Sequence, residues 1–350
     1  MFRKPEPMKG ESPMSVTAKQ LAALLGISES AVSLALNNKP GVSEITREEV
    51  LRAARENGYD FRKVRRKVSD RGKIAFVIYK KHGAVVSDTP FFSELTEGIT
   101  RSCTERGYTL DIRYIIDGSQ VQQELKALQD SGAEGIILLG TEMRQPDLKP
   151  FEAFPLPVVV LDTYSDNVDM NFVLINNIQG AYLATSYLIH QRKACPGYLH
   201  SAYSIANFDE RQDGFYKAVR ENGYSSSGCI VHHLAPMIEG AYQDMRAVLQ
   251  QGEPLASCYF ADNDLIAAGA VKAFKEAGYR IPEDIAVIGF DNSSLCELLD
   301  PPLTTINVPK QAMGKLAFRR LLELLSSETG EVKTPVKIAV MTALIRRESV

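Results

Sequence analysis

The stretch 15–60 restricts the possible folds more than any other part of the chain, because its helix signals are local and closely spaced. Thr17 followed by Gln20 is a capping-box pattern, which predicts a helix over 18–25. Gly26 supplies the left-handed residue that ends a helix before a tight turn. The stretch therefore predicts a short, sharply ended first helix.

Two further helices follow at short intervals. Ser28 is positioned to cap a helix over 29–36, and Ser43 is positioned to cap one over 44–57. Helix, tight turn, helix, loop and helix is the helix-turn-helix layout, in which the second helix presents its first residues to the DNA major groove. The alternative is a plain three-helix cap or dimerisation unit. The side chains expected to face inward are Leu21, Ala22, Leu24, Leu25, Val32, Ala35, Leu36, Ile45, Val50, Leu51 and Ala54.

The charge distribution separates this head from the rest of the chain. Residues 1–72 hold 14 Lys and Arg against 9 Asp and Glu, a net charge of +5, whereas the whole chain carries −3, which leaves −8 for the remainder. Five of the six residues in 62–67 are cationic. A basic head and linker on an acidic body favours nucleic-acid binding by the head. The alternative for residues 62–67 is a solvated tether, because most runs of like charge are exposed to solvent.

From residue 73 the pattern alternates between β and α. The continuous apolar run 74–78 is typical of a parallel strand buried on both faces. Strands are expected at 74–78, 110–116, 135–139, 157–161, 197–200, 229–233, 256–260, 286–290 and 337–344, and helices at 91–106, 120–131, 178–190, 212–222, 241–250, 267–277 and 311–325. This is too many strands for one ordinary open sheet. The pattern predicts an α/β core of two doubly wound subdomains with a ligand between them, at the carboxyl ends of the strands.

Composition excludes several other classes. No apolar run approaches 18 residues and the first residues lack an apolar export core, so we expect a cytoplasmic protein with no membrane partner, and a disordered tail over 1–14. The five cysteines are scattered without a C-x-x-C pair, which predicts reduced thiols and no metal site. We expect no cofactor and no catalytic residues.

Specific residues of the head carry a family resemblance. They are Val16-Thr17, Gln20-Leu21-Ala22, Leu25-Gly26-Ile27-Ser28, Ala31-Val32-Ser33-Leu34-Ala35-Leu36-Asn37, Val42-Ser43, Thr46-Arg47 and Gly58-Tyr59. This string resembles the N-terminal domain of the lactose-repressor (LacI/GalR) family of transcription regulators. Late strings resemble the family's periplasmic-binding-protein-like core, among them 261–264, 289–292 and 301–306. The resemblance covers nearly the whole chain after Met14.

The resemblance implies DNA contacts in the head and linker. Glu29, Ser30 and Leu34 would face base edges, and the candidate phosphate contacts are Thr17, Lys19, Ser28, Ser33, Asn37, Ser43, Thr46 and Arg47. For the hydroxyl groups, helix capping is the alternative role. The family usually has Arg at the position of Leu34, so strong guanine reading is not expected there.

The linker departs from the family pattern. The family's Ala-Arg-x-Leu stretch, which enters the minor groove, corresponds here to Arg65-Arg66-Lys67-Val68. Phosphate contacts are expected from Arg65 and Arg66, and a shorter minor-groove wedge from Val68. Whether this linker forms the family's hinge helix is left open.

The resemblance also implies an effector site in the core. Its candidate residues are Phe92, Asp162, Arg211, Asn263 and Asp291, three of which follow predicted strands. Carboxylate, amide and guanidinium groups that converge from two subdomains suit a polyol or sugar. Each group alone could instead be a helix cap or an ion pair, and Phe92 could be a core residue. The family's second pocket aromatic corresponds to Pro236, so stacking from that side is not expected.

The sequence therefore predicts a homodimeric repressor that binds double-stranded operator DNA and responds to a small-molecule effector, most simply a sugar. A cytoplasmic solute-binding or scaffold protein with a degenerate head is the alternative. The expected regions are a tail (1–14), a DNA-binding head (15–60), a hinge (61–72), a first subdomain (73–162 with 307–328) and a second subdomain (163–306 with 335–350).

Overall fold

The structure is a computed structural model that describes residues 16–37, 41–59, 72–81, 83, 85–86, 90–118, 121–326 and 334–350. It divides into two compact units, 1–71 and 72–350. The expected tail and most of the expected hinge, including Arg65, Arg66 and Val68, lie outside the described residues.

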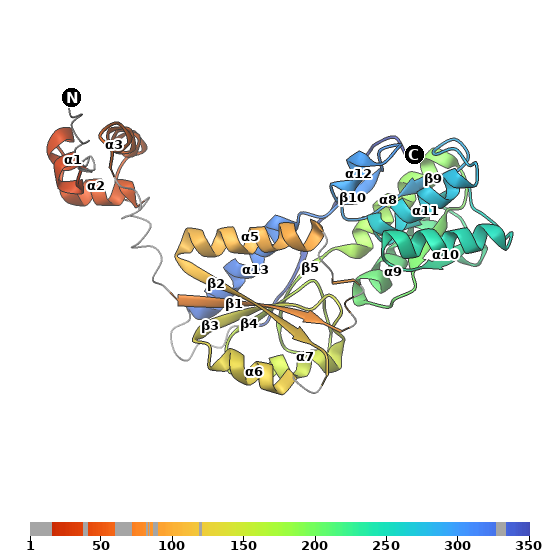
Figure 1. Cartoon of the computed structure of the whole chain (residues 1–350), viewed down its shortest axis with the longest axis horizontal. Coiled ribbons are helices and arrows are strands. Elements are labelled where there is room, and N and C mark those ends of the chain that lie inside the picture. Colours follow the sequence, from red (N-terminus) through yellow and green to blue (C-terminus); the bar gives the residue numbers. More distant parts are fainter. Residues whose placement is uncertain are drawn as a thin grey trace, which may run out of the picture. The chain divides into compact units, whose positions relative to one another are not determined.

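The described part of the first unit is a three-helix head consisting of α1 (Ala18–Leu25), α2 (Glu29–Leu36) and α3 (Glu44–Glu56) (Figure 1). The capping signals act as predicted, because Thr17 and Gln20 form a reciprocal capping box and Gly26 adopts φ 66°. Ser28 and Ser43 accept hydrogen bonds from the backbone N–H groups of Ala31 and Thr46, each at 3.1 Å. The prediction of the three helices is confirmed.

Two of the side chains expected inside the head are exposed. Leu24 is 61 % exposed and Ile45 is 73 % exposed, whereas Leu21 and Val50 are fully buried. At about 100° per residue, Leu24 lies roughly 110° from the centre of the buried face of its helix. The prediction was wrong for these two residues, because the inward stripe of such short helices is narrow.

The second unit begins with a subdomain built on a six-stranded parallel sheet in the order β11-β5-β4-β3-β1-β2. Its strands are β1 (Gly72–Lys80), β2 (Tyr108–Ile116), β3 (Ala133–Leu139), β4 (Val158–Leu161), β5 (Asn171–Ile175) and β11 (Lys337–Val340). Every residue of β4 and β5 is buried, as the apolar run of β4 predicts for a strand covered on both faces. Two helices cover each face: α5 (Pro90–Arg106) with α13 (Lys310–Leu325), and α6 (Val121–Gln129) with α7 (Gln145–Glu152) (Figure 1).

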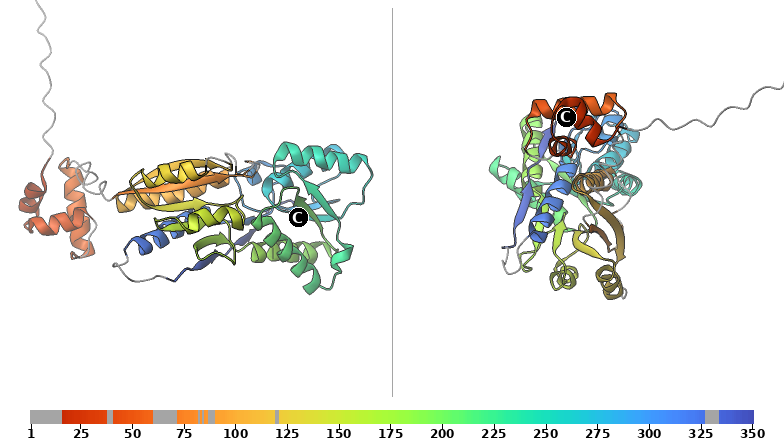
Figure 2. Two further views of the ribbon diagram at one scale, coloured as in Figure 1. Left: turned by 90° about the horizontal axis from the view of Figure 1, so that it is seen from below. Right: turned by 90° about the vertical axis from the view of Figure 1, so that its left-hand side faces the viewer.

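The second subdomain has a four-stranded parallel sheet in the order β7-β6-β8-β9. Its elements are β6 (Gly197–Ser201), β7 (Val231–Leu234), β8 (Cys258–Ala261), β9 (Ala286–Ile288), α8 (Asn177–Arg192), α9 (Ala206–Glu221), α10 (Ile238–Gln250), α11 (Asp264–Glu276) and the short α12 (Leu295–Leu298). An antiparallel pair of strands, β10 (Thr305–Asn307) with β12 (Ala343–Ile345), belongs to the same subdomain. Figure 2 shows the two subdomains end to end.

The chain passes between the two subdomains three times, after β5, after β10 and after β11. The expected boundary at Asp162 therefore falls too early, because β5 pairs with β4 in the first sheet. The expected final strand over 337–344 is two strands in different sheets: β11 pairs with β5, whereas β12 pairs with β10. Residues 171–175 and 337–340 belong to the first subdomain, which corrects the expected partition.

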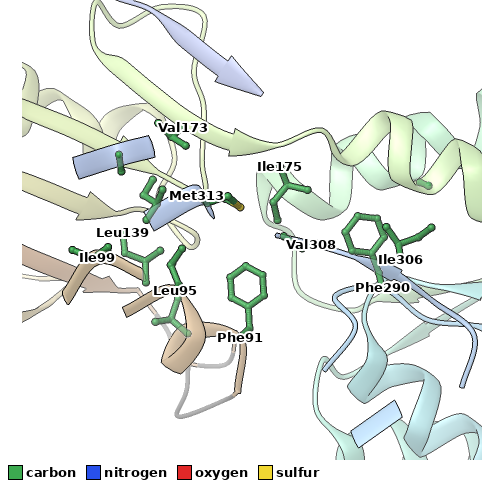
Figure 3. Close-up of a cluster of buried hydrophobic side chains, with 14 of the residues drawn as sticks. Phe91, Leu95, Ile99, Leu139, Val173, Ile175, Phe290, Ile306, Val308 and Met313 are labelled. Atoms are coloured by element: carbon green, nitrogen blue, oxygen red, sulfur yellow. The ribbon is translucent and has the colours of Figure 1, made fainter. Parts of the chain in front are cut away.

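One hydrophobic cluster extends through both subdomains. It contains Phe91 and Met313 from helices of the first subdomain, and Phe290 and Ile306 from the second (Figure 3). Val308 lies on the crossing segment between the two groups and is also buried. The cluster continues across the crossing segments, so the two subdomains share one packed core at the hinge.

The sequence reading missed β5, β10 and α7. The helix α7 contains Pro146 near its start and Pro150 inside it, and two prolines in eight residues indicate a loop. The structure tolerates Pro146 because the first turn of a helix has no partners for its N–H groups. The strands β5 and β10 are too short to show a clear period.

Candidate functional site

The first residues of α2 form the exposed polar face of the head. Ser28, Glu29, Ser30 and Ser33 are exposed, and Leu34 is half-buried. Ser28 both caps the helix and shares a hydrogen bond of 2.8 Å with the hydroxyl of Ser30. This face presents hydroxyl and carboxylate groups, which can hydrogen-bond to base edges. Contact of these residues with DNA remains a prediction.

The structure gives several of the expected phosphate contacts a role inside the head. Arg47 is buried, and its Nη1 donates to the carbonyls of Leu34 and Ala35, each at 3.4 Å. The Asn37 amide donates to the carbonyl of Ser33 at 2.7 Å. Thr17, Ser43 and Thr46 take part in helix caps, whereas Lys19 is exposed. The Arg47 guanidinium therefore ties α3 to the end of α2, and its phosphate contact remains a prediction.

In the second unit a cleft lies between the two subdomains. All five residues expected to bind an effector line it: Phe92, Asp162, Arg211, Asn263 and Asp291. Asp162 directly follows β4 of the first subdomain, whereas Asn263 caps α11 and Asp291 lies just beyond β9 in the second. The cleft is therefore at the carboxyl ends of strands from both sheets, where open α/β sheets bind ligands.

Asp162 is a buried carboxylate with polar partners from both subdomains. Its Oδ2 accepts a hydrogen bond of 2.7 Å from the Thr141 hydroxyl, and its Oδ1 accepts one of 3.0 Å from Asn207. Burial raises the pKa of Asp162 to about 6, although Thr141, Arg211 and Asn207 favour the charged form. The backbone of Asp162 is left-handed at φ 65°, a conformation that costs about 1–3 kcal/mol for a residue other than glycine. The surrounding contacts therefore hold the backbone of Asp162 in a strained conformation and its side chain at the cleft.

Arg211 contributes a guanidinium to the cleft. It lies inside α9, which corrects the expectation that it precedes a helix. The helix begins at Ala206, after Ile205, whose side chain cannot cap it. The Arg211 Nε donates to Asn177 at 2.9 Å and its Nη1 donates to the Asp262 carbonyl. Its guanidinium lies 3.7 Å from the centre of the Phe290 ring. These contacts fix the orientation of Arg211 before any ligand is present.

Asp291 has hydrogen-bonding capacity that the protein leaves unused. Its Oδ1 is buried and has no hydrogen-bond partner among the described residues, although Nη2 of Arg211 lies 3.6 Å away as an ion partner. Burial raises the pKa of Asp291 to about 7, while Arg211 lowers it. Its backbone φ of 112° is again left-handed. A buried acceptor without a donor is rare, and a ligand hydroxyl in the cleft would satisfy it.

Aromatic rings form the apolar walls of the cleft. Phe91 and Phe92 begin α5, and their ring centres lie 5.1 Å apart in an edge-to-face pair. Phe208 lines the cleft from α9, and Pro236 takes the place where the resembled family carries a second aromatic. The first subdomain therefore contributes an apolar wall of Val85, Phe91 and Phe92 beside the polar Thr141 and Asp162.

Other cleft residues were missed by the sequence reading. They include Val85, Phe91, Thr141, Ile205, Asn207, Phe208, Asp264, Leu265 and Ser293. Thr141 follows β3 closely, so the rule that ligands bind at the carboxyl ends of strands could have found it. Asn207 lies one helical turn before Arg211 on the same helix, but the expected start at Gln212 placed both outside that helix.

Within the described ranges, no group of three or more His, Cys, Asp or Glu is placed to hold a metal ion. Among the same residues, no helix is long and apolar enough to cross a membrane. The five cysteines are free thiols.

Two family profiles match the chain. That of the bacterial regulatory proteins, lacI family, matches residues 17–60, and that of the periplasmic binding protein-like domain matches residues 189–350. The first region contains the three helices of the head. The second contains three of the five candidate effector residues, Arg211, Asn263 and Asp291, whereas Phe92 and Asp162 lie outside it.

Whole proteins match along nearly their full length. The HTH-type transcriptional repressor PurR of Haemophilus influenzae is 30% identical over 95% of this chain and 98% of its own, and the ribose operon repressor of Escherichia coli is 32% identical over 89% and 94%. Among solved structures, a transcriptional regulator CelR-cellobiose complex is similar, with a TM-score of 0.70 and 27% identity, over 96% of this chain and 100% of its own. A lac repressor dimer bound to operator has the same fold, with a TM-score of 0.68 at 22% identity. The chain belongs to the lacI family of bacterial regulatory proteins.

Proposed function

We propose that this chain is a homodimeric transcriptional repressor whose DNA binding is controlled by a neutral sugar in the cleft between the core subdomains. The observation that carries the proposal is the unused buried acceptor of Asp291, in the same cleft as Asp162 and with Arg211 nearby. A ligand that donates hydroxyl hydrogen bonds to both carboxylates and accepts from the guanidinium completes this arrangement.

The charge of the cleft favours a neutral ligand over an anion. Three carboxylates, those of Asp162, Asp264 and Asp291, line it together with one guanidinium. A phosphate or carboxylate ligand would meet repulsion from these groups in a region of low dielectric. A sugar offers hydroxyl donors to the carboxylates and C–H faces to Phe91 and Phe92. In small-molecule sites, polar groups commonly fix the orientation of the ligand and apolar side chains cover most of its surface. The ribose operon repressor and the cellobiose complex among the similar proteins support this class.

A flat heterocyclic ligand is the second candidate. Phe92 could stack on one face of such a ring, but Pro236 lacks an aromatic surface to complete a sandwich. We therefore rank it below a sugar.

Control of DNA binding follows from closure of the cleft. Asn207 of the second subdomain bonds to Asp162 of the first, and Arg144 of the first bonds to Asp209 of the second at 2.9 Å. A sugar that binds the closed arrangement better shifts the population toward it, with a coupling of about 1–3 kcal/mol between the two sites. Because β1 begins at Gly72, directly after the linker, a shift of the first subdomain changes the positions from which the linkers of a dimer leave the core.

We further propose that the chain acts in the cytoplasm, where its DNA is, and that it has no catalytic role. The similar proteins are transcriptional repressors, and the Asp162 carboxylate already accepts hydrogen bonds from Thr141 and Asn207. The head residues that we assign to base edges are Glu29, Ser30 and Leu34, with the remaining candidates on phosphates.

Two measurements test the proposal. A thermal-shift screen of neutral mono- and disaccharides, nucleobases and small acids should show stabilisation by a sugar, about 2.7 kcal/mol at 100 times its Kd. Footprinting on the chain's own promoter DNA should show one discrete site with two-fold symmetry, and binding should weaken steeply with salt. Uniform weak protection would instead support a scaffold protein with a degenerate head.

A further inference from the structure

The Glu142 carboxylate organises the backbone segment that follows β1. Glu142 lies in the turn between β3 and α7, and only 2 % of it is exposed. Its Oε2 accepts hydrogen bonds from the N–H groups of Lys81 at 2.8 Å and Gly83 at 3.0 Å. Its Oε1 accepts from the N–H groups of Val85 and Val86, both at 2.9 Å. One side chain therefore satisfies four backbone donors of one segment.

These four donors need such a partner because they lie in neither a helix nor a strand. The bond from Val86 is buried and those from Lys81, Gly83 and Val85 are partly buried, so N–H groups without a partner there would be costly, and a buried carboxylate without donors more so. A single carboxylate that faces several N–H groups gives these donors an acceptor and is itself stabilised by them. Each such charge-assisted hydrogen bond is stronger than a neutral one. Glu142 therefore fixes the positions of these four N–H groups more firmly than packing alone could.

The segment held by Glu142 forms a wall of the cleft. Val85 lines the cleft directly, and Val86 is buried in the hydrophobic cluster that also contains Phe91. Phe91 and Phe92 lie in the first turn of α5, and both line the cleft. The position of this apolar wall thus depends on where Glu142 holds the backbone before it.

The same turn also carries contacts to the other two borders of the cleft. Thr141 donates to Asp162 at 2.7 Å. Arg144 reaches the second subdomain, where it donates to Asp209 at 2.9 Å and to the Ser204 hydroxyl at 2.5 Å. Movement of this short turn would therefore move an effector carboxylate, the apolar wall and the contact across the cleft together.

We propose that Glu142 is a positioning residue for the effector site, which sets the distance between the apolar wall formed by Val85, Phe91 and Phe92 and the cleft carboxylates and thereby the size of sugar that fits. The proposal rests on the proposed function, because it requires that a sugar bind in this cleft. Glu142 itself does not touch the sugar.

The test uses the full chain and three variants. Glu142→Gln keeps the size of the side chain but turns an NH₂ group toward two of the four N–H donors. Glu142→Asp keeps the charge on a shorter arm. Glu152→Gln is the matched control, because Glu152 is exposed and accepts a single backbone N–H bond, from Asp169 at 2.7 Å. Calorimetry measures the Kd for ribose and for cellobiose, alongside the Tm of each variant and its affinity for promoter DNA without sugar.

We expect Glu142→Gln to weaken binding of the better sugar by about tenfold, the factor for a net loss of one charge-assisted hydrogen bond, and to change the ratio between the two sugars. Glu142→Asp should recover part of the loss, and Glu152→Gln should match the wild type. A lower Tm with unchanged Kd and unchanged sugar ratio would overturn the proposal and leave Glu142 a purely structural group. If the wild type bound neither sugar, the choice of effector class would itself be contradicted, and this inference with it.

Discussion

The head and the cleft are built in opposite ways. In the head, the candidate contact residues are mostly exposed, and their hydrogen bonds are local, as in the Ser28 cap of its own helix. In the cleft, the candidate residues are mostly buried and their partners are distant in the sequence, as Asn207 is from Asp162. The head is thus left free for a large polar partner, while the cleft is already organised for a small one.

This difference predicts two separable sets of variants. A change in the cleft should affect stability and sugar binding with little effect on DNA binding by the sugar-free protein. A change on the exposed face of α2 should affect DNA recognition with little effect on stability.

The largest effect is expected from Arg211→Met. This change removes the bonds to Asn177 and the Asp262 carbonyl and leaves Asp291 without its ion partner. Removal of one partner of a buried ion pair lowers the free energy of unfolding by about 3–5 kcal/mol, and sugar binding should be lost. Urea unfolding and calorimetry measure the two effects. Arg220→Met, on the exposed side of the same helix, is the control and should be nearly neutral.

Asp291→Asn should separate binding from stability. The amide keeps the shape but loses the charge that attracts sugar hydroxyls, so we expect sugar affinity to fall by roughly 10–100-fold, as for a loss of about 1.4–2.8 kcal/mol. Stability should be unchanged or higher, because the cost of burying a carboxylate is removed. A variant that unfolded more easily and still bound sugar normally would contradict the assigned role. Asp300→Asn, at an exposed position, serves as the control.

The pH dependence of the cleft follows from the same two carboxyl groups. The pKa of Asp291 is raised to about 7 and that of Asp162 to about 6, above their ordinary value near 4. Between pH 4 and 7 the folded protein holds protons that the unfolded chain releases, so the stability from these groups is present at low pH and is lost as the pH rises through 7. Sugar affinity should move the other way and increase from pH 5 to 8, because ionised carboxylates accept hydroxyl bonds more strongly. A Kd that did not vary with pH would contradict this account.

The smallest of these effects is expected in the head. Glu29→Gln should change preference at one base position of the operator by about 1 kcal/mol, the low end of the range for a base contact, and leave the Tm and sugar affinity unchanged. Binding-site selection with randomised DNA measures the preference. Glu48→Gln on α3, which is also exposed, should not alter it. If both variants weakened binding to all DNA sequences equally, Glu29 would act through electrostatics with the DNA phosphate backbone instead.

The same contrast explains what the sequence could predict. The helices of the head were predicted to within one residue because Thr17, Ser28 and Ser43 are caps that act within three residues. The start of α9 was placed six residues late, since Ile205 gives no capping signal and the helix begins there only because the fold places it. Arg211 was nevertheless found through the family resemblance.

Long-range features were less predictable still. The partition of β5 and β11 into the first sheet depends on strand pairing, which leaves no local signal in runs of four or five residues. The four bonds of Glu142 join residues about sixty positions apart, and a single Glu after a strand does not indicate such a cluster. In the head, the sequence gives no signal that Arg47 is buried, and only the packed structure places it against the carbonyls of α2.

The central claim is that occupancy of the cleft by a neutral sugar controls binding of the head to its operator. The most direct measurement is quantitative footprinting of the promoter while the best sugar from the thermal screen is titrated, with the wild type and Asp291→Asn side by side. We predict that operator occupancy by the wild type changes by about 5–150-fold in affinity over the range in which the sugar binds, and that Asp291→Asn needs roughly 10–100-fold more sugar for the same change. Operator occupancy that stayed constant while the sugar saturated the cleft would contradict the account.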